Sequence, residues 1–304
     1  MIKRLLFIFF VCIQLFVTAN SSDTVLIKEH LTAITKTEKS RNYKNLEVLN
    51  NVAQYIYNEF EKYADTTYYQ KYSVEGVEYK NVICVFGKEN AQSIIVGAHY
   101  DVCENQEGAD DNGSGTVGLL ELARLLKEKT LNYKIEIVAY TLEEPPFFRS
   151  EYMGSYIHAK SLIDKNEDVY GMFCLEMIGY FDERKHTQDY PIGLLSLVYG
   201  NKGDYITLVN KFGKGKFARK FSGNFKNCTT IKTKKFTGPK SLPGIDFSDH
   251  LNYWKFGFSS LMITDTAFYR NKNYHKNSDK METLNFQKMT KVIDAVYDSI
   301  VNME

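Results

Sequence analysis

Acidic residues and histidines follow strand-like segments of this sequence at widely spaced points. Asp101 lies just behind the apolar run "SIIVGA", and Glu143 and Glu144 end the β-branched run "KIEIVAYTL". In a parallel sheet, ligands bind outside the carboxyl ends of the strands, so we expect residues at these ends to converge. The set expected to meet there comprises His99, Asp101, Asp110, Asp111, Glu143, Glu144, Glu176 and His275.

Two prolines, Pro145 and Pro146, stand directly behind the paired glutamates, in a chain that has five prolines. Proline fixes its own φ and pushes the preceding residue towards extended geometry, so this stretch is predicted to form a stiff, non-helical corner. Neighbouring side chains on an extended corner point in opposite directions. One glutamate can therefore bind a metal ion while the other faces a water molecule and moves its proton.

The donor atoms of this set are carboxylate oxygens and imidazole nitrogens. Such ligands, without thiolates, suit zinc in a hydrolytic role, and two ions can share a bridging carboxylate. Glu176, flanked by "MFCL" and "MIGY", would be costly to bury unless it were paired or bound to metal. Each motif alone has an ordinary alternative: a hydrogen-bonded histidine, an exposed glutamate pair, a helix cap in "GADDNGSG" or an exposed loop around His275.

Together the motifs resemble the co-catalytic di-zinc exopeptidases, the family of secreted bacterial aminopeptidases and glutamate carboxypeptidase II, with the glutaminyl cyclases as relatives. The resemblance extends from about Tyr79 to the end of the chain and implies a phosphorylase/hydrolase-like zinc peptidase fold. The motifs that carry it are "GAHYD" (97–101), "GADDNGSG" (108–115), "EE" (143–144), "LEMIGY" (175–180), "FSDH" (247–250) and "NYH" (273–275).

The resemblance also implies a set of metal ligands. Asp111 matches the carboxylate that bridges the ions, His99 and Glu176 would complete one zinc site, and Glu144 and His275 would complete the other. Two Zn²⁺ ions are expected, with a single ion as the alternative. Glu176 departs from the pattern, because aminopeptidases of the family commonly have aspartate there.

Further residues match positions around the ions. Glu143 matches the general base, and Asp101 would orient His99. Tyr274, beside the histidine, would donate a hydrogen bond to the developing oxyanion. Ser248 and Asp249 match a family motif near the site, to which we assign no role.

Strand-like and helix-like segments alternate along the chain, which predicts an α/β three-layer sandwich with a mixed, mainly parallel central sheet. We expect one catalytic domain over residues 21–304. The predicted strands are 77–87, 93–101, 134–142, 170–180 and 259–266, and the predicted helices are 24–40, 45–63, 114–129, 152–162, 248–257 and 285–301.

The N-terminus has the pattern of a secretory signal peptide, with Lys3 and Arg4 before a short apolar run, and cleavage is expected after about residue 20. The apolar run is too short for a comfortable membrane span, so we expect a secreted or periplasmic protein without stable membrane insertion. Four cysteines would remain, of which Cys84 and Cys174 are predicted to pack as small apolar groups in strands.

The formal net charge of +1 argues against general binding of polyanions, but basic residues gather in residues 211–240. That segment has nine lysines, one arginine and no acidic residue, with phenylalanines between them. We expect a solvated, mobile surface excursion held to the core by its aromatic side chains, and no nucleic-acid partner. Binding of a polyanion is the alternative.

These observations predict a secreted zinc metallopeptidase that acts on peptides, with an aminopeptidase as the first choice. A water between the ions would attack the scissile carbonyl after losing a proton to Glu143. One alternative is a single-zinc glutaminyl cyclase, and another is a binding ectodomain of the same fold without catalysis. The sequence leaves the substrate side chain and the oligomeric state open.

Overall fold

The computed structural model describes residues 21–213 and 215–303, so the predicted signal peptide lies outside the described residues. Its strands form one sheet in the order β1-β2-β4-β3-β5-β8-β6-β7. The strands are β1 (Thr66–Val74), β2 (Val77–Phe86), β3 (Ser93–His99), β4 (Lys134–Tyr140), β5 (Val169–Glu176), β6 (Ile206–Lys211), β7 (Thr233–Gly238) and β8 (Ser260–Thr264). β4, β3, β5 and β8 run parallel to one another, and β6 is parallel to β7. β1 with β2, β2 with β4 and β6 with β8 are antiparallel.

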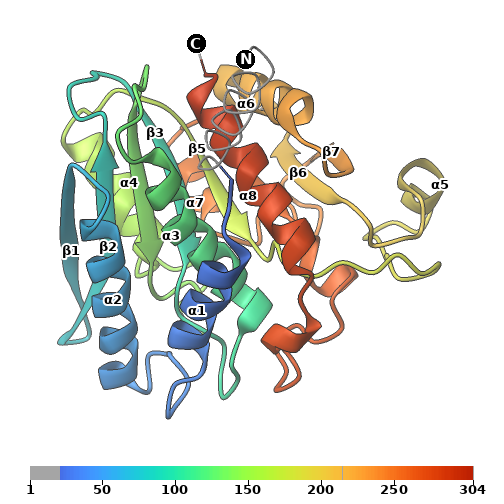
Figure 1. Cartoon of the computed structure of the whole chain (residues 1–304), viewed down its shortest axis with the longest axis horizontal. Coiled ribbons are helices and arrows are strands. Elements are labelled where there is room, and N and C mark those ends of the chain that lie inside the picture. The colour runs from blue at the N-terminus through green and yellow to red at the C-terminus, as the bar shows by residue number, and fades with distance from the viewer. Residues whose placement is uncertain (1–20, 214, 304) are drawn as a thin grey trace, which may run out of the picture.

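Helices cover both faces of the sheet (Figure 1). One face carries α1 (Thr24–Thr35), α2 (Leu46–Glu61), α3 (Gly115–Leu126), α6 (Gly215–Cys228) and α8 (Phe286–Val301). The other face carries α4 (Gly154–Asp164) and α7 (His250–Lys255), while α5 (Leu195–Tyr199) stands apart from the sheet. This three-layer α/β arrangement confirms the predicted fold class.

The alternating direction of apolar side chains along the central strands explains why both faces need a helical layer. In β3, Ile94 and Val96 belong to the core under α3, and Ile95 belongs to the core under α4 and α7. Successive side chains of a strand point to opposite faces, so an all-apolar strand must be covered twice. The continuous apolar runs of the sequence are therefore the central strands.

The parallel strands bring the predicted site residues to one edge. His99 is the last residue of β3 and Glu176 is the last residue of the neighbouring β5. Glu143 and Glu144 follow β4 on the other side of β3. Since parallel strands end at the same edge, these four side chains approach one another without any long excursion of the chain.

The basic segment 211–240 is where the sequence-based prediction is wrong. It is no surface excursion, because it contains α6 and β7 and so contributes a helix and an edge strand to the sandwich. Phe217, Phe221 and Phe225 lie on one side of α6, four residues apart, and are fully buried. Lys216, Arg219, Lys220 and Lys226 of α6 are half-buried or exposed, so the basic side chains lie away from this buried side.

Within the described residues, the structure has no helix that is long and apolar enough to span a membrane. All eight strands belong to one sheet, which fits the single catalytic domain that we propose for residues 21–304.

Candidate active site

The corner behind β4 is held by Asp101. Its Oδ1 accepts a hydrogen bond from the backbone N–H of Glu143 at 3.2 Å, and its Oδ2 accepts one from Glu144 at 3.1 Å. His99 Nδ1 lies 3.5 Å from the same Oδ1 and 3.2 Å from the Asp101 carbonyl oxygen. Asp101 thus fixes the backbone of the glutamate pair. It also faces His99, which the sequence predicted it to orient.

One cluster of donor atoms forms between β3 and β5. His99 Nε2 lies 3.5 Å from Asp111 Oδ1 and 3.4 Å from Glu176 Oε2, and all three residues are buried. Ser248 Oγ donates a hydrogen bond to Glu176 Oε2 at 2.8 Å, and Asn112 Nδ2 donates one at 3.3 Å. These bonds give Ser248 the contact that the sequence did not assign: it orients the Glu176 carboxylate.

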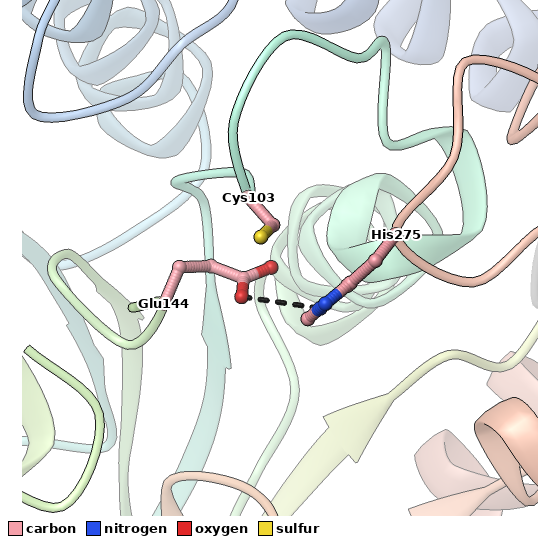
Figure 2. A group of neighbouring side chains, drawn as sticks. All are labelled: Cys103, Glu144 and His275. Atoms are coloured by element: carbon pink, nitrogen blue, oxygen red, sulfur yellow. Dashed lines mark ion pairs between the residues drawn. The ribbon is translucent and has the colours of Figure 1, made fainter. Parts of the chain in front are cut away.

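A second cluster forms on the other side of Asp111. His275 Nε2 lies 3.1 Å from Asp111 Oδ2 and 3.3 Å from Glu144 Oε2. Figure 2 shows the Glu144 carboxylate and the His275 ring meeting, with Cys103 beside them. Asp111 therefore presents one oxygen to each histidine, so the five predicted ligands meet in two clusters that share it.

The spacing of these atoms suits zinc. Ligand atoms bonded at about 2.1 Å to a tetrahedral ion lie about 3.4 Å apart. The four separations between histidine nitrogens and carboxylate oxygens, 3.1 to 3.5 Å, match that value. Glu144 Oε1 is buried and has no hydrogen-bond partner. Buried carboxylate oxygens without a donor are expensive unless a cation faces them, so the residues present fit a metal.

Crowding of carboxylates shifts their proton affinities. Burial, together with the charge of Asp111, raises the pKa of Glu144 to about 7. Burial also raises the pKa of Glu143 well above its usual value; His99 opposes this, while Glu144 and Glu176 add to it. For Asp111, burial is outweighed by hydrogen bonds from His275 and His99, which hold its pKa below the usual range. Asp111, the residue predicted to bridge the ions, is thus the carboxylate of these three that keeps its negative charge most firmly.

Glu143 and Tyr274 border the two clusters, and a carboxylate oxygen of Glu143 also lies within 4.8 Å of ligand atoms of His99 and Glu144. Glu143 Oε2 is 3.8 Å from His99 Nε2, farther than any of the four ligand contacts described above. The Tyr274 ring stacks on the His275 ring, with 3.8 Å between centroids. Burial and the charges of Asp111, Glu144 and Glu143 raise the pKa of Tyr274 far above its usual value. Its hydroxyl therefore stays protonated and can act as a hydrogen-bond donor.

A sequence model of peptidase family M28 matches residues 81–300. The chain belongs to peptidase family M28. The uncharacterized protein YfbL of Escherichia coli is 41% identical over 277 residues, which cover 88% of this chain and 85% of YfbL. Leucine aminopeptidase 1 of Ajellomyces dermatitidis is 26% identical over 223 residues, 69% of this chain and 52% of that protein. The chain thus spans about half the length of this relative.

Solved structures share the fold of this M28 chain. LapB from Legionella pneumophila superposes with a TM-score of 0.72 at 22% identity, covering 92% of this chain and 71% of LapB. The glutaminyl cyclase from Bacteroides thetaiotaomicron superposes with a TM-score of 0.70 at 16% identity, covering 94% of this chain and 100% of the cyclase. At these identities the likeness concerns the fold, which peptidases and cyclases have in common.

Sequence reasoning missed Asp279, which holds the turn η1 (Ala109–Ser114) where Asp111 lies. Its carboxylate accepts hydrogen bonds from the backbone N–H of Asp110 and of Asp111, each at 3.0 Å. Asp110 Oδ2 in turn accepts a hydrogen bond from Asn271 Nδ2 at 2.7 Å. This network ties the Asp111 turn of the M28 chain to the loop that carries His275. The only sequence signal for Asp279 was its position four residues behind His275.

Asp249, the other residue without an assigned role, is fully buried, and neither of its carboxylate oxygens has a hydrogen-bond partner. Burial raises its pKa to about 7; His99 opposes the shift and Glu176 adds to it. The charges of His99 and Glu176 therefore influence the pKa of the Asp249 carboxyl group, although this group forms no hydrogen bond with a predicted ligand.

An apolar pocket of about 80 Å³ opens beside Glu176. Its walls are largely aromatic and include Tyr190, Tyr199, Phe236, Phe247, Phe268 and Tyr269. Ligand sites are commonly apolar cavities with a few polar groups, and here the charged groups in the lining are Glu176, Asp189 and Lys234. The pocket offers space for an apolar side chain next to the candidate site of this M28 chain.

Proposed function

We propose that this chain is a zinc-dependent aminopeptidase that is exported to the periplasm or secreted and releases N-terminal residues from peptides. One observation carries the proposal: two clusters of donor atoms, from residues that are buried except for His275, share Asp111, and Glu143 lies beside them. Membership of peptidase family M28 supports peptide hydrolysis, and the relatives that are aminopeptidases favour cleavage at a free N-terminus. The signal-like N-terminal sequence supports export.

His99, Asp111 and Glu176 would hold one zinc ion, and Asp111, Glu144 and His275 the other. Bound zinc would polarise the scissile carbonyl and lower the pKa of the attacking water. Ser248, Asp101 and Asp279 keep these carboxylates and imidazoles oriented through the hydrogen bonds described above.

Glu143 moves the proton in this proposal. Its carboxylate takes a proton from the attacking water and delivers it to the nitrogen of the leaving amine. The raised pKa of Glu143, caused first by burial, favours holding that proton between the two steps. Tyr274 donates its hydroxyl hydrogen to the carbonyl oxygen as negative charge develops there.

The pocket beside Glu176 would take the side chain next to the scissile bond. Aromatic side chains are prominent in its walls, so we expect peptides with an apolar or aromatic N-terminal residue to be cleaved faster than peptides with a charged one. A panel of peptides with free and with acetylated N-termini, assayed with and without chelator, tests the proposal. Equal cleavage of blocked and free peptides would exclude an aminopeptidase.

Replacing Glu143 by glutamine tests the proton transfer. Glu143→Gln should retain both zinc ions and lower kcat by about 100- to 10,000-fold, because general acid–base catalysis has that size. Exposed Glu151 offers a control, and Glu151→Gln should leave kcat and metal content unchanged. In contrast, His275→Ala should lose zinc as well as activity. Wild-type turnover in Glu143→Gln would contradict the assigned role.

The same assays separate the other two functions. A glutaminyl cyclase would convert peptides with N-terminal glutamine to the lactam and would carry one zinc ion per chain. A binding protein of this fold would carry no zinc and hydrolyse no peptide. Two equivalents of zinc in elemental analysis, together with release of N-terminal residues, would support the aminopeptidase over both.

A further inference from the structure

Cys103 lies at the cluster formed by Glu144 and His275, although no sequence motif pointed to it. It follows β3 in the loop that leads from Asp101 to Gly108, and it is 8% exposed. Its Sγ, a carboxylate oxygen of Glu144 and a ring nitrogen of His275 all lie within 4.8 Å of one another. Figure 2 shows the thiol directed towards the Glu144 carboxylate, from a different loop than either partner.

The loop around Cys103 is held on both sides. The N–H of Val102 donates to the Arg41 carbonyl oxygen at 3.1 Å, and Asn42 Nδ2 donates to the Glu104 carbonyl oxygen at 2.5 Å. The buried Arg41 side chain donates to the carbonyl oxygens of Tyr100 and Gly108. These contacts come from a segment that precedes the region matched by the M28 model, so the thiol is positioned by a part of this chain outside that region.

A second observation points to a ligand at this place. Glu144 uses Oε2 to contact His275, while its Oε1 is buried without a hydrogen-bond partner. Glu144 is 4% exposed, so water does not solvate this oxygen freely. An unpaired carboxylate oxygen beside a thiol and an imidazole is the arrangement that a bound cation would satisfy.

The surroundings of Cys103 differ from those of the other buried cysteines. Cys84 belongs to the apolar core on one face of the sheet, and Cys174 belongs to the core on the other face. Cys84 packs as a small apolar group, as the sequence predicted, whereas Cys174 Sγ also lies 3.5 Å from Ser248 Oγ and from His250 Nδ1. Cys103 instead faces two of the predicted zinc ligands, so packing alone does not account for its position.

We propose that Cys103 Sγ is a further ligand of the ion held by Glu144 and His275. This proposal rests on the zinc clusters of the proposed function and adds a donor to one of them. Cys103 would bind as the thiolate, with its proton released to solvent when the ion enters. The cluster of Glu144 and His275, called the Glu144 half, would then have nitrogen, oxygen and sulfur donors. The cluster of His99 and Glu176, called the His99 half, has nitrogen and oxygen donors alone.

Unequal donors give the two halves unequal metal preferences. A thiolate favours soft or borderline ions such as Zn²⁺ and Cd²⁺, whereas carboxylates also accept harder ions such as Mn²⁺. We expect the Glu144 half to retain zinc when the His99 half exchanges it. In a titration with chelator, one zinc ion per chain should leave well before the other.

Cobalt replacement tests the sulfur ligand directly. Full-length protein loaded with Co²⁺ should show an intense thiolate-to-cobalt charge-transfer band in the near ultraviolet. Cys103→Ser should abolish this band and weaken the binding of one of the two ions by roughly 10- to 100-fold, the size seen when a supporting ligand contact is lost. Cys228→Ser, a partly exposed cysteine outside the site, should leave the spectrum unchanged.

The wild-type spectrum decides the question even where a variant is unstable. Wild-type protein that binds two cobalt ions without the charge-transfer band overturns the thiolate ligand and leaves the proposed aminopeptidase intact. A band that persists in Cys103→Ser also overturns it. Protein that binds no cobalt and no zinc overturns both proposals, while peptide hydrolysis is read separately from the spectrum.

Discussion

Asp111 joins the two halves of the candidate site through its two oxygens. Oδ1 faces His99 and Oδ2 faces His275, while its backbone N–H is held by Asp279. Because the backbone of Asp111 is fixed and each carboxylate oxygen already faces a histidine, this side chain would lose little rotamer freedom on binding two cations. This geometry makes Asp111 the residue on which the distance between the two halves depends.

Ser248 supports the His99 half through its hydrogen bond to Glu176. Ser248→Ala removes a donor to a buried carboxylate oxygen, so Glu176 should lose part of its orientation. We expect binding of one of the two zinc ions to weaken by about 10- to 100-fold, measured by competition with a chromophoric chelator. Ser196→Ala, in the exposed α5, is the matched control and should leave both affinities unchanged. Equal zinc affinity in Ser248→Ala and wild type would contradict this role.

Sequence reasoning brought together the residues that lie in motifs and missed those that do not. His99, Asp111, Glu143 and Glu144 follow predicted strands, so their convergence could be expected. Cys103 and Asp279 lie in loops whose paths depend on contacts with distant segments, Arg41 for one and Asp110 for the other. Such contacts have no local signature, because they arise only when the loops are packed.

At the scale of elements, the central strands β3, β4, β5 and β8 were predictable, whereas the edge strands β1 and β7 and the buried strand β6 beside β7 were missed. β3, β4, β5 and β8 are apolar on both faces, which gives continuous runs in the sequence. β1 and β7 lie at the two edges and are largely half-buried, with polar residues throughout. Lysines on an edge strand discourage pairing with other chains, and in the sequence they resemble an unstructured charged surface.

Helix α6 offers a test of how the basic segment contributes to stability. Phe221 is fully buried and stacks on Phe173 of β5 with 4.4 Å between ring centroids. Phe221→Ala should lower the free energy of unfolding by about 3–5 kcal/mol, because it leaves a large cavity in the core. Phe212 is 66% exposed, and Phe212→Ala should change that free energy by no more than about 0.5 kcal/mol. Urea denaturation measures both, and equally small effects would contradict the assignment of α6 to the core.

At the scale of the whole molecule, the candidate site concentrates buried acidic groups at one edge of the sheet. Asp111, Glu143, Glu144, Glu176 and Asp249 are each at most 6% exposed. Burial raises the pKa of Glu143, Glu144, Glu176 and Asp249, so keeping their charge costs folding free energy in the absence of a counter-ion. Zinc should relieve this cost and so couple metal binding to global stability.

Removing the metal should therefore destabilise the fold. Free zinc at 100 times its dissociation constant would stabilise the folded chain by about 2.7 kcal/mol for each site, since the unfolded chain lacks the cluster. Thermal denaturation with excess zinc and with excess chelator measures the difference in Tm. In His275→Ala the zinc-dependent shift should shrink, because one half of the site is lost. Identical Tm values for zinc-loaded and chelated wild type would contradict the coupling.

The proposed ligands come from strand ends and loops scattered between residue 99 and residue 275, and they meet only at the edge of the completed sheet. In an unfolded chain, the imidazoles of His99 and His275 are too far apart to bind the same pair of cations. A polypeptide that crosses a membrane unfolded, through a translocation pore, would therefore carry no bound zinc with it. Its supply of zinc would then be set by the compartment in which it folds, not by the one in which it is made.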